Sequence, residues 1–182
     1  VGKTDEELRY AIQSNIHCIN VESQSELERI NDICDELKTK QDIAIRVNPD
    51  VDAKTHVKIT TGKAENKFGI EFDYTNSIYD IAANLPNINI AGVSVHIGSQ
   101  ITSLKPFKKA YTIIYDLINN LKNLGHNIKH VDLGGGLGVP YSDDESIPTF
   151  TEYANLIQSI FGNTNLKVYI EPGRLLLANS GL

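Results

Sequence analysis

Residues 90–97 read Ile-Ala-Gly-Val-Ser-Val-His-Ile, and their alternation decides the fold class. On an extended segment one face carries the apolar side chains Val93, Val95 and Ile97. The opposite face carries Gly92, Ser94 and His96. A parallel strand that is covered on both faces should be apolar on both, so the small and polar face indicates a different environment. We therefore expect this strand to line an interior and to end on the imidazole of His96.

Three other predicted strands repeat this pattern. Residues 43–48 place Arg46 and Asn48 opposite an apolar face, Asp132 opposes both of its neighbours, and Glu171 shares a face with Tyr169. Each strand directs a small or polar face inward and carries an ionisable or amide group at its C-terminal end. This arrangement is typical of a TIM barrel, in which side chains at the strand C-termini build one mouth.

Strands and amphipathic helices alternate along the chain, which predicts right-handed βαβ units and a parallel sheet. A capping-box pattern at Ser23 and Glu26 precedes the first expected helix, and Pro148 is expected in the first turn of the last one. The predicted strands are residues 16–21, 43–47, 88–97, 130–133 and 167–170. The predicted helices carry the apolar sets 27–37, 78–85, 104–121 and 150–160.

Five strands cannot close an eight-stranded barrel. The chain also begins with Val1 and contains no methionine. We therefore expect residues 1–182 to be one incomplete α/β domain, a partial (β/α)8 barrel with about the last five strands.

Composition excludes several classes of partner. A net charge of −6 with dispersed lysines argues against nucleic acid and anionic membranes. No apolar run approaches the roughly 18 residues that a membrane helix needs, and no signal-peptide pattern opens the chain. Cys18 and Cys34 fall in a strand pattern and on a helical apolar face, so we expect packed thiols and a reducing, cytoplasmic setting.

Two short motifs indicate an anion site. The glycine tract Gly134–Gly136 follows a predicted strand, and Glu171-Pro172-Gly173-Arg174 follows the next strand. Glycines at a strand end free backbone N–H groups for an anion, most often phosphate. Three glycines alone are also compatible with a plain turn, and the neighbouring acidic and basic residues favour a charged cofactor instead.

Six ordered segments resemble the barrel of the alanine-racemase-fold, fold-type III pyridoxal 5′-phosphate (PLP)-dependent decarboxylases. The segments are Asn20-Val21-Glu22-Ser23, Arg46-Val47-Asn48-Pro49, Lys67-Phe68-Gly69, His96-Ile97-Gly98-Ser99-Gln100, Asp132-Leu133-Gly134-Gly135-Gly136 and Glu171-Pro172-Gly173-Arg174. The resemblance covers essentially the whole chain. It implies a PLP-binding barrel and an amino-acid decarboxylase. Gln100 and the long stretch 48–66 favour the branch that converts meso-2,6-diaminopimelate to L-lysine, with ornithine, arginine and carboxynorspermidine enzymes as alternatives.

The resemblance also implies roles for individual residues. His96 matches the histidine that stacks on the pyridine ring, and Glu171 matches the glutamate that hydrogen-bonds the ring nitrogen. In racemases of the same fold an arginine holds that position, so Glu171 favours decarboxylation. The expected phosphate contacts are Ser99, Gly134, Gly135, Gly136, Pro172, Gly173 and Arg174. Arg174 is also a candidate for the substrate, because guanidinium suits either anion.

Each assignment has a structural alternative. A histidine on a strand is more often a hydrogen-bonded core residue, Ser99 is compatible with a turn, and Arg174 with a surface ion pair. Arg46 resembles an inward arginine that orients site groups, or it pairs with Asp132 or Glu22. Lys67 is expected to be structural. The spacing of His17, His56, His126 and His130 indicates no metal site.

Relative to the family, the chain lacks two parts. The expected Schiff-base lysine belongs to earlier barrel strands, and a C-terminal β-domain contributes a cysteine and a tyrosine across a homodimer interface. We therefore expect a small amino acid as the substrate of the full-length homodimer and an inactive fragment in isolation. A non-catalytic PLP-binding or regulatory relative, and a PLP-independent barrel that binds a sugar phosphate, remain alternatives.

Overall fold

A parallel β-sheet forms the centre of the chain, and the computed structural model describes it over residues 1–52, 68–142 and 144–180. All strand pairs are parallel within these ranges, which confirms the predicted α/β class. The short β3 (Ile70–Glu71) pairs with β2 beside the main path. The main path runs in the order β1 (Ile19–Val21), β2 (Gln41–Asn48), β4 (Ile88–Ser94), β5 (His130–Asp132) and β6 (Lys167–Tyr169).

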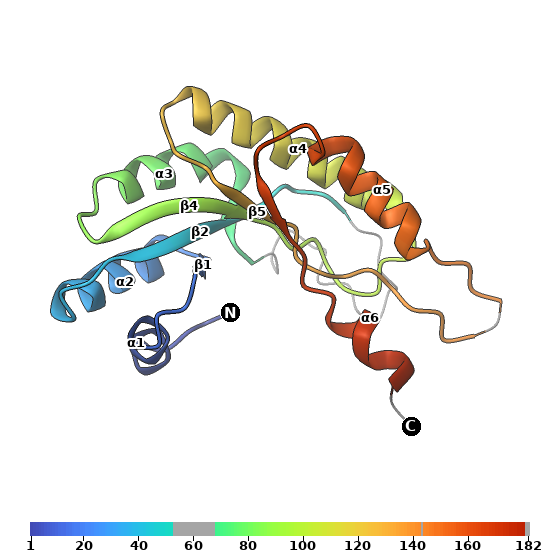
Figure 1. Ribbon diagram of the computed structural model, residues 1–182, viewed down its shortest axis with the longest axis horizontal. Coiled ribbons are helices and arrows are strands. Elements are labelled where there is room, and N and C mark those ends of the chain that lie inside the picture. The colour runs from blue at the N-terminus through green and yellow to red at the C-terminus, as the bar shows by residue number, and fades with distance from the viewer. Residues whose placement is uncertain (53–67, 143, 181–182) are drawn as a thin grey trace.

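Helices follow the strands as the sequence predicts. Figure 1 shows α3, α4 and α5 along one side of the sheet, whereas the loops that follow β4 and β5 lead to its other side. Figure 1 also shows α6 on that second side, near the C-terminus. The helices are α1 (Asp5–Gln13), α2 (Gln24–Glu36), α3 (Thr75–Ala83), α4 (Leu104–Asn123), α5 (Phe150–Phe161) and α6 (Gly173–Leu177), with short 3-10 turns at Phe72–Tyr74 and Ala178–Ser180.

The core lies between the apolar strand faces and the helices. Ile43, Ile45 and Val47 of β2 are at most 1% exposed, as the predicted strand parity requires. The long helix α4 contributes its i, i+3, i+4 stripe to the same core. Its members Phe107, Tyr111, Ile114, Ile118 and Leu121 are buried. Burial of one strand face against helices leaves the other face, which carries the polar side chains, for the site.

Three elements were not predicted. Helix α1 begins with a capping box, in which the Glu7 N–H donates to Thr4 and the Thr4 N–H donates to the Glu7 carboxylate. This Thr-x-x-Glu signal precedes the buried Leu8 and Ile12 and is readable in the sequence. The two-residue β3 and the five-residue α6 are too short to show a periodicity.

One predicted helix start and one predicted capping box need correction. Pro148 was expected in the first turn of the last helix, but α5 begins at Phe150 with Thr149 as its N-cap. Thr149 forms a complete capping box with Glu152, which places the N-cap one residue and the helix start two residues beyond the proline. At α2 the box is only half formed. Ser23 accepts the Glu26 N–H, but the Glu26 carboxylate accepts the N–H of Glu22 instead of that of Ser23.

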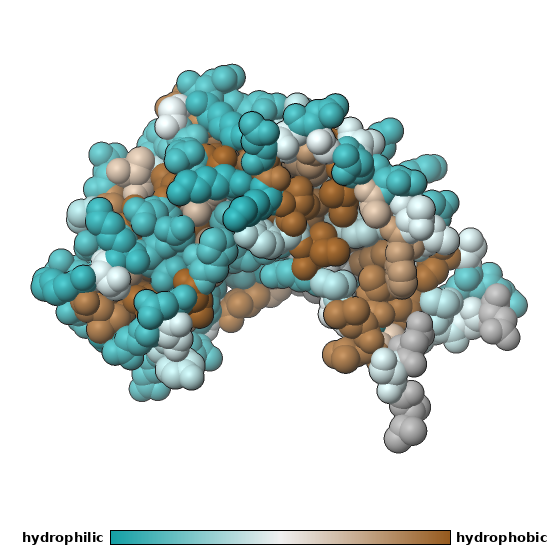
Figure 2. All heavy atoms as spheres, viewed as in Figure 1, coloured by the Kyte–Doolittle hydropathy of each residue, from teal (hydrophilic) through white to brown (hydrophobic). Residues whose placement is uncertain are grey.

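The face drawn in Figure 2 is mostly polar, with scattered apolar spots and one larger apolar region. Figure 2 shows apolar residues gathered at the lower right, around α6 and the neighbouring loops. Exposed apolar side chains there include Tyr141, Ile170, Leu176 and Leu177. Across the described ranges, no helix combines the length and apolarity required to cross a membrane. Cys18 and Cys34 are both free thiols, as predicted, although Cys18 lies just before β1.

Candidate active site

Two of the predicted site residues, His96 and Glu171, meet at the backbone of Gly135. The N–H of Gly135 donates to Nδ1 of His96 over 3.3 Å. On the other side, a Cβ built on Gly135 would lie 2.1 Å from the carbonyl oxygen of Glu171. Because β4, β5 and β6 are adjacent parallel strands, their C-terminal ends bring these residues to one edge. These contacts bring the His96 ring and the backbone of Glu171 to the same edge of the sheet.

His96 is held as a neutral ring. Burial lowers the pKa of its imidazole, and the positive charge of Arg46 lowers it further. The charge of Asp132 has the opposite, smaller effect. A neutral imidazole has one acceptor nitrogen, and Nδ1 uses it for the Gly135 N–H. His96 thus has a fixed orientation beside the glycine tract.

Asp132 is the residue whose importance the sequence did not reveal. It is 7% exposed, and both of its carboxylate oxygens accept hydrogen bonds. Oδ1 accepts the N–H of Gly134 over 2.9 Å, and Oδ2 accepts Nδ2 of Asn20 over 2.8 Å. Its backbone carbonyl accepts the Val95 N–H over 2.8 Å. Asp132 therefore joins β1, β4 and the first glycine of the tract.

Glu171 lies beside Asp132, although the residue is exposed. Its N–H donates to the carbonyl of Gly134 over 2.8 Å, which fixes its backbone. Burial raises the pKa of its carboxyl group, and the neighbouring carboxylate of Asp132 raises it further, against the opposing charge of Arg46. Glu171 consequently binds a proton more readily than an ordinary glutamate does.

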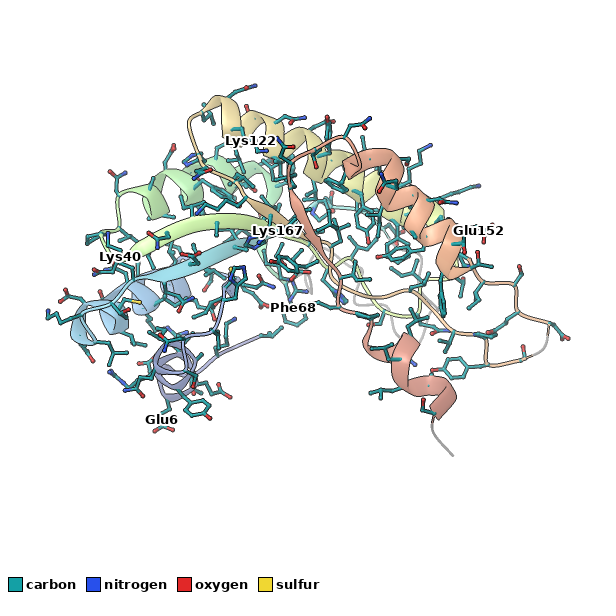
Figure 3. The ribbon with its side chains drawn as sticks, in the orientation of Figure 1. Glu6, Lys40, Phe68, Lys122, Glu152 and Lys167 are labelled. Carbon is teal, nitrogen blue, oxygen red and sulfur yellow. The ribbon has the colours of Figure 1, made fainter. Side chains whose placement is uncertain are left out.

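Arg46 supplies the positive charge of the site. Its guanidinium donates to Oε1 of Glu22 over 2.7 Å, and both side chains are largely buried. This pairing is one of the alternatives that the sequence left open. The Arg46 guanidinium also lies 5.8 Å from the centre of the Phe68 ring. In Figure 3, Phe68 lies below the sheet, whereas Lys122 of α4 lies above it. Nε of Arg46 is buried and has no acceptor among the described residues.

The glycine tract lies against its neighbours so closely that no side chain would fit. Gly134 and Gly136 have φ angles of 65° and 101°, in the left-handed region that favours glycine. A Cβ on Gly134 would lie 2.5 Å from the Val95 carbonyl oxygen. A Cβ on Gly136 would lie 2.1 Å from the carbonyl oxygen of Gly98. Within the described residues, the N–H of Gly136 has no acceptor. An anion at the glycine tract would supply an acceptor for this N–H.

The remaining predicted phosphate contacts are Ser99, Pro172, Gly173 and Arg174. Ser99 is exposed on the loop that follows β4, and Pro172 is the N-cap of α6. The N–H of Gly173 donates to the Glu171 carbonyl over 2.9 Å. The exposed Arg174 donates to the hydroxyl of Tyr141, and its guanidinium lies 5.8 Å from the centre of that ring. Arg174 thus contacts the loop after the glycine tract, and the described contacts include none to the tract itself.

The other histidines do not form a metal site in the described part of the chain. His17 and His130 pack with Tyr169, whose hydroxyl lies 3.3 Å from Nε2 of His17. Burial lowers the pKa of His130. His56 and Lys67, which the sequence treated as structural, lie outside the described residues.

Known proteins resemble this chain over its full length. A family model for the pyridoxal-binding domain of pyridoxal-dependent decarboxylases matches residues 1–178. Diaminopimelate decarboxylase of Vibrio cholerae is 48% identical over 100% of this chain, which is 44% of that protein. The Aquifex aeolicus diaminopimelate decarboxylase is 41% identical, with 100% of this chain and 43% of that protein covered.

A solved structure agrees with these sequence matches. Diaminopimelate decarboxylase of Helicobacter pylori, complexed with L-lysine, superimposes with a TM-score of 0.88 at 36% identity. That match covers 94% of this chain and 43% of the other. The chain therefore spans less than half the length of the relatives it matches.

Proposed function

We propose that this chain serves the decarboxylation of meso-2,6-diaminopimelate to L-lysine and carbon dioxide. The chain belongs to the pyridoxal-dependent decarboxylases and matches their pyridoxal-binding domain. The observation that carries the proposal is the meeting of His96 and Glu171 at Gly135. It brings the His96 ring, the Glu171 backbone and a glycine backbone together beyond the ends of three adjacent strands, and the Glu171 carboxyl group is close enough to Asp132 for that carboxylate to raise its pKa. The names of the similar proteins support the choice of substrate.

The residues present fit PLP. The N–H of Gly136 lacks an acceptor among the described residues, and a phosphate oxygen would supply one. The N–H groups of Gly134 and Gly135 already donate to Asp132 and His96, so these two glycines would hold the tract in the shape of a phosphate-binding cup while Gly136 contacts the anion. We assign Ser99, Gly173 and Arg174 to the rim of this cup, with Pro172 starting α6 beside them. Arg174 would need to exchange its contact with Tyr141 for the phosphate or the substrate carboxylate.

We assign His96 to the face of the pyridine ring and Glu171 to its nitrogen. When bound, PLP supplies a ring that accepts the electron pair released as carbon dioxide leaves. The Glu171 carboxylate would accept a hydrogen bond from the ring nitrogen, and its negative charge would favour the protonated form of that nitrogen. The Gly135 N–H orients His96, and Asp132 orients the backbone of Gly134, so both groups are positioned before the cofactor binds.

Other parts of the active protein lie outside residues 1–182 in this proposal. The relatives are more than twice as long, and we expect their additional segments to supply the lysine that carries the cofactor and a C-terminal β-domain. We also infer a homodimer with shared active sites in a cytoplasmic setting, which two free thiols fit. Sedimentation analysis of the full-length protein should give the mass of a dimer, and a monomer that retains full activity would contradict the shared sites.

The substrate is tested by measuring carbon dioxide release from four amino acids. We expect the full-length protein with saturating PLP to act on meso-diaminopimelate and not appreciably on ornithine, arginine or carboxynorspermidine. Release from one of the latter alone would overturn the substrate. PLP binding without any release would favour a non-catalytic relative, and absence of PLP binding would overturn the cofactor assignment.

A further inference from the structure

Gln100 joins the loop after β4 to the loop after β5. Its side-chain Nε2 donates to the Val139 carbonyl over 2.6 Å, and its Oε1 accepts the Val139 N–H over 3.2 Å. The amide thus exchanges two hydrogen bonds with one backbone residue, as paired strands do. No other neutral side chain of this length offers both a donor and an acceptor in one plane.

Backbone bonds continue the same connection. The N–H of Ile101 donates to the Gly136 carbonyl over 2.8 Å, and the Gly138 N–H donates to the Ile101 carbonyl over 3.0 Å. Gly138 permits this approach, because a Cβ there would lie 3.2 Å from the Ile101 oxygen and 3.3 Å from Cδ of Gln100. The two loops therefore form a short parallel ladder that runs directly into the glycine tract.

The backbone of Gln100 is in an unfavourable conformation. Its φ angle is 56°, in the left-handed region that glycine and asparagine occupy more readily than glutamine does. Glycine would relieve this strain but would lose both bonds to Val139. A strained non-glycine residue that makes two long-range bonds indicates that its side chain is needed at this position.

We propose that Gln100 is a positioning residue that makes one phosphate-binding cup out of the two loops; this inference rests on the proposed function. It acts through Val139 and Ile101. The bond from Ile101 fixes the carbonyl of Gly136 and so limits the rotation of this glycine, whose N–H lacks an acceptor among the described residues. Ser99 immediately precedes Gln100, so the same anchor limits the movement of its backbone.

The test compares two ligands of the full-length protein, PLP and pyridoxal, which lacks the phosphate. In the Gln100→Ala variant the dissociation constant of PLP should rise roughly tenfold or more, because loosening the cup weakens charge-assisted hydrogen bonds. The dissociation constant of pyridoxal should change less than about twofold. Isothermal titration calorimetry measures both values. Equal losses for both ligands, or unchanged PLP affinity, would overturn the assignment.

Gln41→Ala is the matched control. Gln41 is also buried, and its Nε2 donates to backbone carbonyls of Ile16 and Asp42 over 3.3 and 3.0 Å, at the start of β2. The Gln41→Ala substitution removes these two side-chain bonds, which lie at the N-terminal ends of the strands, opposite the end where Gln100 lies. We expect this variant to lose stability while the ratio of the two dissociation constants stays that of the wild type. A change of that ratio as large as in Gln100→Ala would contradict a specific role for Gln100.

A wild-type measurement keeps the proposal testable if Gln100→Ala does not fold. Inorganic phosphate should slow amide hydrogen exchange at residues 100–101 and 136–139 together, because the ladder couples the two loops. Slowing at 136–139 alone would contradict the coupling. A failure of the proposed function gives a result distinct from a failure of the Gln100 assignment. In that case the wild-type protein would bind PLP no more tightly than pyridoxal.

Discussion

At the scale of single residues, Gly135 and Gly125 show two different reasons why a position requires glycine, lack of space for a side chain and a left-handed backbone. Gly135 has no room for a Cβ, whereas Gly125 has open space but a φ angle of 95°. We expect Gly135→Ala to cost about 1–3 kcal/mol of unfolding free energy and to abolish PLP binding, because the backbone of Glu171 must shift. Gly125→Ala should cost about 1 kcal/mol and leave PLP affinity unchanged. Urea denaturation and PLP titration distinguish them, and retained PLP affinity in Gly135→Ala would contradict the cup.

The raised pKa of Glu171, to which the charge of Asp132 contributes, should make the unfolding free energy depend on pH. Because the folded-state pKa of Glu171 is raised above the ordinary 4.5, its protonated form favours folding. This stabilisation is present below pH 4.5 and is lost as the pH rises through the raised pKa. Asp132→Asn removes one of the two causes and keeps an oxygen for the Gly134 N–H, so its loss should be smaller.

The comparison is made by urea denaturation at a series of pH values. Glu171→Gln is the reference, because it removes the titrating group and should show none of this loss. If Asp132→Asn and wild type follow the same curve relative to Glu171→Gln, the two carboxyl groups are not coupled.

At the scale of elements, the capping box of α5 determines where that helix begins. Thr149→Ala removes the acceptor of the Glu152 N–H and should lower the unfolding free energy by about 1 kcal/mol. Thr151→Ala, at an exposed position in the same first turn, should have little effect. Denaturation midpoints of both variants give the comparison, and equal values would show that the cap is not what holds the helix start.

The side chains at the strand ends could be predicted from the sequence, whereas the hydrogen bonds between different elements could not. The alternation around His96 and Glu171 placed both residues at one edge, because side-chain direction in a strand has a period of two. The bonds from Asp132 to Gly134 and from Gln100 to Val139 depend on left-handed backbone at Gly134 and Gln100. Local propensity does not reveal such long-range pairs. Helix α1 was missed although its capping box is readable, and the short α6 gives no periodic signal.

At the scale of the whole molecule, the parallel sheet positions the site. The helices bury one strand face, and the order β4, β5, β6 places three strand ends next to each other. The family match gives this chain a pyridoxal cofactor, which we propose binds at this edge. Glu171 is the residue that distinguishes decarboxylation from racemisation in our account. The charge of Glu171 is therefore the central claim.

Glu171→Gln in the full-length protein tests that claim most directly. Glutamine keeps the shape and a hydrogen bond, but it loses the charge that favours a protonated ring nitrogen. Carbon dioxide release from meso-diaminopimelate at saturating PLP should fall roughly a hundredfold or more, since each 1.36 kcal/mol of barrier is a factor of ten. PLP should still bind, and Glu28→Gln, on the exposed side of α2, should match the wild type. A Glu171→Gln rate within about twofold of the wild type would contradict the account.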